Sequence, residues 1–338
     1  MSLKLSREAF DDVLKDLGKE YKIYAPIRIK GEGRFSDTDV VRYGEVSGLD
    51  EIEIHEKAHF SPKEILFPIT QTLFYFTEGD YQEPKDDQKK IIVFLRPCDI
   101  NGVTRLDQVF LENGEDKDIY YERLREKVKF FMIECIEGFD NCFCVSMDAN
   151  KTEKYAAAIR FGDDMFVEIK DEALTNAFQE KGEFVNFEPT FIHENLVNVK
   201  LPDIEQITTE TFEDDMWKEY AQRCIACGRC NFVCMTCSCW TMQDIAYDEN
   251  NSSGERRRVW AGCHVDGFTD MAGGHGFRKN YGDRMRFKTM HKINDFKKRN
   301  GYHMCVGCGR CDDVCPEYIS FSSCINKVTK LVGEERKQ

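Results

Sequence analysis

The sequence repeats one spacing of cysteines, Cys-x2-Cys-x2-Cys-x3-Cys, in Cys224-Ile-Ala-Cys227-Gly-Arg-Cys230-Asn-Phe-Val-Cys234 and in Cys305-Val-Gly-Cys308-Gly-Arg-Cys311-Asp-Asp-Val-Cys315. Three thiolates separated by two residues each can wrap one corner of a four-iron cubane, and Gly228 and Gly309 let backbone amides approach the sulfides. The fourth cysteine of such a run lies on the following turn and binds the other cluster. The two runs therefore predict a ferredoxin-like domain with two [4Fe–4S] clusters.

This exchange of the fourth cysteine predicts the ligands of each cluster. The first cluster should be bound by Cys224, Cys227, Cys230 and Cys315. The second should be bound by Cys305, Cys308, Cys311 and Cys234. A pair of zinc sites is the alternative, but zinc ribbons use Cys-x2-Cys pairs without a third cysteine at the same spacing. Met235 stands where a proline usually follows the fourth cysteine. Because proline is not a ligand, this difference affects how well a cluster is shielded and not whether it is bound.

The composition indicates a globular protein from a reducing compartment. The 47 Lys and Arg against 61 Asp and Glu give a net charge of −14, which disfavours binding to nucleic acid or to an anionic membrane. No apolar run reaches the roughly 20 residues that cross a bilayer, and the first residues lack the apolar core of a signal peptide. We therefore expect a cytoplasmic protein. Its 16 cysteines are too sparse for a disulfide scaffold, so metal binding or redox chemistry is expected instead.

The first half of the chain has the pattern of a mixed α/β domain. Residues 91–95 and 128–133 are continuous apolar runs, typical of strands that are covered on both faces. Residues 99–110 have apolar side chains at helical spacing, so the three segments predict a βαβ unit with parallel strands. Other predicted elements are a helix capped by Ser6, extended segments at 21–29 and 40–46, and a hairpin over 155–169.

Four further cysteines follow the ends of these two strands. Cys98 follows the first strand, Cys135 follows the second, and Cys142 and Cys144 come one short loop later. Because the carboxyl ends of parallel strands meet at one edge of a sheet, the four thiols can converge there. Spacing alone leaves two interpretations open, a third [4Fe–4S] cluster or buried structural cysteines. We predict the third cluster, with Cys98, Cys135, Cys142 and Cys144 as its ligands.

Some chemically notable residues lie outside these three sets. The remaining cysteines are Cys237, Cys239, Cys263 and Cys324. They could form a fourth metal site, but their wide scatter favours cysteines that pack beside the clusters. Residues 278–299 contain nine Lys and Arg against two Asp. This basic stretch fits a solvated helical face, a counter-charge for the clusters, or a surface that docks a partner subunit.

The sequence contains no pattern of an independent catalytic site. No P-loop and no Gly-x-Gly-x-x-Gly after a strand is present, and the glycine-rich stretch 272–278 is predicted to be a tight turn. No general base, nucleophile or oxyanion pattern is visible either. We therefore expect no catalytic residues and no direct binding of a nicotinamide on this chain.

These observations predict two domains. Residues 1–205 form a mixed α/β domain that carries one iron–sulfur site, and residues 206–338 form a helix-rich ferredoxin domain with two [4Fe–4S] clusters. A stretch rich in Pro, Thr and acidic residues, about 189–215, marks the linker, and beyond it the apolar strand-like runs disappear. The residues between the two cysteine runs are expected to be a long insertion in the helical domain.

Several longer stretches resemble the A subunits of anaerobic sulfite reductases. They are Arg34–Asp39, His55–Pro62, Cys98–Asn101, Asn141–Met147, Asp270–Arg278 and Met304–Cys315. The resemblance runs nearly end to end. More distantly, the chain resembles the β subunits of sulfur-reducing nickel–iron hydrogenases, which share the Arg-Pro-Cys-Asp and Cys-Phe-Cys elements.

The resemblance implies an electron-transfer subunit in an NADH-dependent complex of three subunits. A flavin subunit would oxidise NADH, a sirohaem subunit would reduce sulfite to sulfide, and this chain would relay electrons between them. In the related β subunits a third four-iron cluster matches Cys98, Cys135, Cys142 and Cys144, which makes three [4Fe–4S] clusters in all. The alternative is the β subunit of a sulfur-reducing hydrogenase or polysulfide reductase. A structural zinc protein without a redox role is the third possibility.

Overall fold

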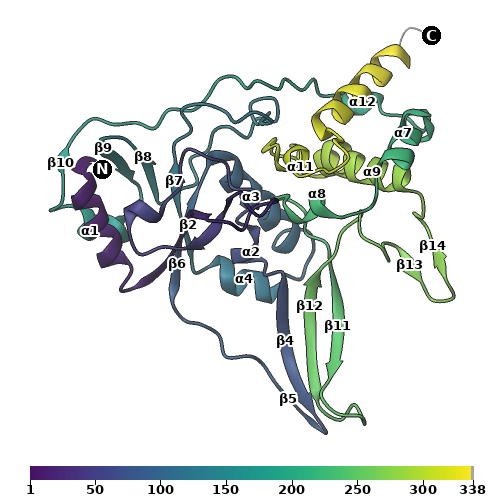
Figure 1. Cartoon of the computed structure of the whole chain (residues 1–338), viewed down its shortest axis with the longest axis horizontal. Coiled ribbons are helices and arrows are strands. Elements are labelled where there is room, and N and C mark those ends of the chain that lie inside the picture. The colour runs from purple at the N-terminus through teal and green to yellow at the C-terminus, as the bar shows by residue number, and fades with distance from the viewer. Residues whose placement is uncertain (336–338) are drawn as a thin grey trace.

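The computed structural model describes residues 1–335, and its largest element is an eight-stranded mixed sheet (Figure 1). The strand order is β10-β1-β9-β8-β7-β6-β2-β3. The strands are β1 (Ser2–Ser6), β2 (Tyr21–Ile29), β3 (Val40–Glu45), β6 (Lys90–Leu95), β7 (Val128–Ile133), β8 (Ala157–Arg160), β9 (Asp164–Ile169) and β10 (Glu183–Phe184). The four central strands β2, β6, β7 and β8 run parallel, and the strands on both sides of them are antiparallel.

The predicted βαβ unit is confirmed. Helix α3 (Pro97–Phe110) connects β6 to β7, and these two strands pair in parallel along their length. The predicted hairpin is also present, as the antiparallel pair β8 and β9. Helix α1 (Arg7–Leu17) begins at Ser6, whose Oγ accepts a hydrogen bond from the backbone N–H of Ala9, as expected of an N-cap. The strand β1 before this helix was not predicted.

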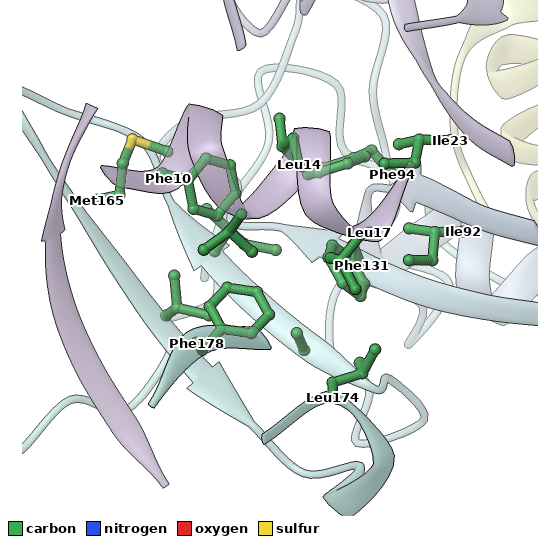
Figure 2. Close-up of a cluster of buried hydrophobic side chains, with 14 of the residues drawn as sticks. Phe10, Leu14, Leu17, Ile23, Ile92, Phe94, Phe131, Met165, Leu174 and Phe178 are labelled. Atoms are coloured by element: carbon green, nitrogen blue, oxygen red, sulfur yellow. The ribbon is translucent and has the colours of Figure 1, made fainter. Parts of the chain in front are cut away.

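Both faces of the large sheet are covered, which explains the continuous apolar sequence of its central strands. Figure 2 shows one face, where Phe10 and Leu14 of α1 pack with Phe94 and Phe131 of the sheet. Alternate residues of β6, such as Val93, face the opposite core. That core is covered by α3 together with the short helices α2 (Lys63–Leu66) and α4 (Ile119–Arg125).

A second, four-stranded sheet joins the two halves of the chain, in the order β11-β12-β4-β5. Its strands are β4 (Thr70–Thr77), β5 (Asp80–Gln82), β11 (Trp240–Ala246) and β12 (Gly254–Trp260). They form the projection at the bottom of Figure 1. Two of these strands therefore lie beyond residue 205, where the sequence has no apolar strand-like run. The hairpin β11–β12 has no strand signal in its sequence, because it is largely polar. It is held by pairing with β4 rather than by an apolar face of its own.

The remainder of the C-terminal half is mostly helical, and its helices pack around a third apolar core. They are α6 (Thr209–Glu213), α7 (Met216–Arg223), α8 (Arg229–Phe232), α9 (Tyr281–Met290), a π-helical turn η4 (His291–Asp295), α10 (Phe296–Asn300), α11 (Arg310–Asp313) and α12 (Phe321–Glu335). A small hairpin, β13 (Asp270–Met271) and β14 (His275–Gly276), precedes α9. No helix formed by residues 1–335 has the length and apolar character needed to span a bilayer.

The predicted linker is an extended segment that runs from the large sheet to the helical end (Figure 1). It is fixed to its surroundings, because the Val199 backbone N–H donates to Ser146 and the Lys200 N–H donates to Asn326. The division into domains at residue 205 stays a prediction. The four-stranded sheet, which takes two strands from each side of that residue, holds the two parts together.

Candidate metal centres

The first predicted cluster set lines a single cavity. Cys224, Cys227 and Cys230 of the first run and Cys315 from the end of the second run all border it. Burial raises the pKa of the Cys224 thiol. Three nearby thiols raise it further, those of Cys227, Cys230 and Cys315. Cys227 is exposed, so this set lies closer to the surface than the second one. Four thiol donors that border one cavity fit an iron–sulfur cluster.

The second predicted set is more deeply buried. The thiol of Cys234 raises the pKa values of three cysteines of the second run, Cys305, Cys308 and Cys311. The fourth cysteine of the first run therefore lies beside the first three cysteines of the second run, which is the arrangement of the ferredoxin pattern. Burial raises the pKa of Cys305 to about 12. Since metals bind the thiolate, cluster binding at this set must be coupled to release of protons.

The two runs have the same local backbone geometry. Gly228 precedes α8 and Gly309 precedes α11, and both have φ 72° and ψ −8°. In each run an amide two residues after the first cysteine donates to its sulfur at 3.4 Å, from Ala226 to Cys224 and from Gly307 to Cys305. Hydrogen bonds of this kind to ligand sulfur tune the potential of a cluster.

The third predicted set also comes together, at the carboxyl ends of β6 and β7. Cys98, in the first turn of α3, is buried, and the thiol of Cys144 lies near it. Burial raises the pKa of Cys144 to about 12, with further increases from Cys142 and Cys135. The guanidinium of Arg96 donates to the Cys135 sulfur at 3.4 Å. The parallel strands thus bring the four thiols to one edge of the sheet, as expected.

The third set adjoins the second cysteine run. The backbone N–H of Phe143 donates to the carbonyl oxygen of Gly307 at 2.7 Å, and the Cys142 thiol lies 3.7 Å from the carbonyl oxygen of Cys308. The approach is close enough that a Cβ on Gly309 would lie 2.2 Å from the carbonyl oxygen of Asn141. The three sets therefore form a continuous series, with the second set in the middle.

A buried ion pair locks this contact. Arg310, between two cysteines of the second run, donates through both terminal nitrogens to Asp99, at 2.6 and 2.8 Å, and through Nε to the carbonyl oxygen of Ala58. Nearby, the ammonium group of Lys57 pairs with Asp313 at 2.6 Å. These residues were not singled out in the sequence. The only available signal was Asp99 directly after Cys98 and Arg310 directly before Cys311.

Of the cysteines outside the three sets, Cys237 and Cys263 lie near the first two sets, and Cys324 does not. The Asn231 amide contacts the sulfurs of Cys237 at 3.6 Å and Cys263 at 3.2 Å, whereas Cys324 is buried against the Thr289 hydroxyl in the helical core. Within residues 1–335, no three His, Cys, Asp or Glu side chains converge as a single metal ion requires.

Comparisons with known proteins agree with this geometry. Residues 223–319, which contain both cysteine runs, match the model of a 4Fe-4S dicluster domain. The site and this match define an iron–sulfur electron-transfer protein. Over 351 aligned residues the chain is 28% identical to the protein "Sulfhydrogenase 2 subunit beta" of Pyrococcus furiosus, covering 96% of this chain and 98% of that protein. No solved structure matches the chain.

These findings support part of what the sequence resemblance implied. An iron–sulfur subunit similar to a sulfhydrogenase β subunit is supported, and so is the presence of [4Fe–4S] clusters. The narrower assignment to sulfite reductase is not supported by either comparison. The number of clusters and the identity of each ligand stay predictions.

Proposed function

We propose that this chain is the electron-relay subunit of a multi-subunit oxidoreductase and holds three [4Fe–4S] clusters on the three cysteine sets. The observation that carries the proposal is their continuous series, in which the second set contacts the third and exchanges its fourth cysteine with the first. A [4Fe–4S] cluster, when bound, accepts and releases one electron at a time.

The protein's own part in this relay is to hold and shield the ligands. Burial of Cys305 and Cys308 keeps water from the middle set, and the Arg310–Asp99 pair fixes its distance from the third set. The first set opens toward the surface at the exposed Cys227, beside the exposed side chain of Ile225. A series with a buried middle site and one accessible end suits exchange of electrons with a partner at that end.

The identity of these partners is the finer part of the proposal. Similarity to a sulfhydrogenase β subunit over nearly the whole chain favours a β-subunit role in a hydrogenase or polysulfide reductase complex. The second candidate is the relay subunit of an anaerobic sulfite reductase, between a flavin subunit that oxidises NADH and a sirohaem subunit. It is supported by the resemblance of the stretches quoted from the sequence, such as Asn141–Met147 and Asp270–Arg278.

Reconstitution distinguishes the two candidates. The anaerobically prepared chain is combined either with hydrogenase subunits or with flavin and sirohaem subunits encoded in the same genome. The hydrogenase assignment predicts hydrogen-dependent reduction of polysulfide that requires this chain, and the sulfite reductase assignment predicts sulfite-dependent oxidation of NADH that requires it. Cys305→Ala should abolish electron transfer in the active combination, whereas Cys324→Ala, outside the three sets, should retain it. Full activity of the Cys305 variant would contradict the relay.

A further inference from the structure

Two lysines of the basic stretch point into the protein rather than into solvent. Lys288 in α9 is 4% exposed and Lys292 in the π-helical turn η4 is 3% exposed. Burial of a lysine is unfavourable unless a negative group lies nearby. In the part of the chain from residue 1 to 335, no carboxylate forms an ion pair with either ammonium group.

The two ammonium groups lie among cysteines and neutral oxygens, with the Phe321 ring 5.4 Å from Lys288 Nζ and the buried Lys63 also close to Lys292. Lys292 Nζ donates to the Thr236 hydroxyl at 2.8 Å, and the thiols that act on it most strongly are those of Cys234, Cys237 and Cys305. Two of these three belong to the second cluster set. The Thr236 hydroxyl in turn lies 3.5 Å from the sulfur of Cys234, so its hydrogen bond holds the ammonium group of Lys292 beside the second set.

Lys288 occupies the boundary between the first two sets. Its Nζ lies 3.4 Å from the carbonyl oxygen of Cys230, and the thiols of Cys230 and Cys311 both act on it. Cys230 belongs to the first set and Cys311 to the second. The lysine also borders the cavity that the first set lines.

Lys292 lies in an unusual segment of backbone, and its side chain is buried. A π-helical turn, which is rare and often found at functional sites, separates α9 from α10. The carbonyl oxygen of Lys292 accepts a hydrogen bond from the Met304 N–H at 2.9 Å, directly before Cys305. The turn therefore ties the lysine to the second cysteine run through the main chain as well as through charge.

We propose that Lys288 and Lys292 are positioning residues whose fixed positive charges raise the reduction potentials of the clusters they face. Lys292 acts on the second cluster, and Lys288 acts on the first and the second. One-electron reduction adds one negative charge to a cluster, so a nearby buried cation stabilises the reduced form more than the oxidised form. The inference rests on the proposed function, because it needs clusters on these cysteines.

The test is a redox titration of the full-length, iron-loaded chain, followed by electron paramagnetic resonance. In Lys292→Met we expect the reduced-to-oxidised ratio of one cluster at a fixed potential to fall about tenfold, which is 59 mV for a one-electron couple. In Lys288→Met two clusters should shift in the same direction. Lys292→Arg should keep the native potential. Lys298→Met is the matched control, because this lysine is exposed on α10.

The outcomes separate this inference from the proposed function. A native chain without reducible clusters would end the proposed function itself. Native clusters with unchanged potentials in both Met variants would overturn only the role of the lysines. If Lys292→Met and Lys292→Gln do not retain iron whereas Lys292→Arg does, the need for a positive charge is supported. Loss of iron from Lys292→Arg as well would overturn it, because shape rather than charge would then be required.

Discussion

Arg310 connects the chemistry of the middle cysteine set to the architecture of the α/β sheet. Its side chain is 2% exposed and that of its partner Asp99 is completely buried. The planar guanidinium matches the carboxylate with two parallel hydrogen bonds, a geometry that lysine cannot reproduce. The pair lies between Cys98 of the third set and Cys311 of the second, so it fixes their separation.

Arg310→Met should therefore be strongly destabilising. The change leaves the Asp99 carboxylate buried without its partner, and loss of one member of a buried pair typically costs about 3–5 kcal/mol. We expect a reduced urea midpoint in anaerobic denaturation followed by circular dichroism. Arg310→Lys should recover only part of the loss.

The matched control is a surface pair with the same bidentate geometry. Arg256 donates to Asp244 at 2.6 and 2.7 Å, but both side chains are about half exposed. Arg256→Met should cost about 1 kcal/mol or less, because water and salt weaken exposed pairs. Equal effects of the Arg256 and Arg310 substitutions would contradict the account of the buried pair.

A second prediction at this scale concerns Gly309. Gly309→Ala adds a Cβ 2.2 Å from the Asn141 carbonyl oxygen, in addition to the cost of φ 72° for a residue with a side chain. We expect the second run to separate from the third set and the iron content to fall by about four per chain, as measured colorimetrically. Gly301→Ala is the control, since Gly301 has φ 83° but nothing within 4 Å of its added Cβ. It should lose only about 1–2 kcal/mol of stability and keep its iron.

At the scale of elements, the strands that could be predicted were those whose own sequence is apolar. The apolar runs of β6 and β7 and the helical spacing of α3 predicted the type of each element and the parallel pairing of the two strands. The runs are apolar because both faces of these strands are buried. The hairpin β11–β12 could not be predicted in this way. Its β12 strand contains three consecutive arginines, and one of them, Arg258, is buried against Asp118 and Gln71 from the N-terminal half.

The turn of this hairpin offers a test that leaves the clusters intact. Asp248 accepts hydrogen bonds from the backbone N–H groups and the hydroxyls of Ser252 and Ser253. Asp248→Ala should speed hydrogen exchange of the β11 and β12 amides without changing the iron content. Glu249→Ala, an exposed neighbour in the same turn, should leave exchange unchanged. A loss of iron in Asp248→Ala would show that the hairpin and the clusters are not independent.

The same turn has a defined dependence on pH. Hydrogen bonds from Ser253 and Ser252 lower the pKa of Asp248 to about 2. A carboxyl group whose pKa is lowered by folding contributes its stability above its unfolded pKa of about 3.9, and the contribution is lost as the pH falls through the folded value. Protection of the hairpin amides should therefore persist at pH 4 and decrease toward pH 2. Loss of protection already near pH 5 would contradict this assignment.

At the scale of the whole molecule, the three cysteine sets could be proposed from the sequence, and the structure places the members of each set near one another, while their role as cluster ligands stays a prediction. The repeated spacing implied the exchange of Cys234 and Cys315, and the strand ends implied that Cys98 and Cys135 would meet. What could not be predicted is the order of the sets. That order depends on contacts between distant segments, such as Phe143 with Gly307, which leave no periodic signal in the sequence.

The iron and zinc content of the anaerobically purified full-length chain tests the central claim most directly. Three clusters of four irons predict about 12 iron atoms per chain, a matching content of acid-labile sulfide and a visible chromophore that dithionite bleaches. The variant Cys144→Ala should then contain about eight. About eight iron atoms in the native chain would remove the third cluster. Stoichiometric zinc without a reducible chromophore would contradict the electron relay altogether.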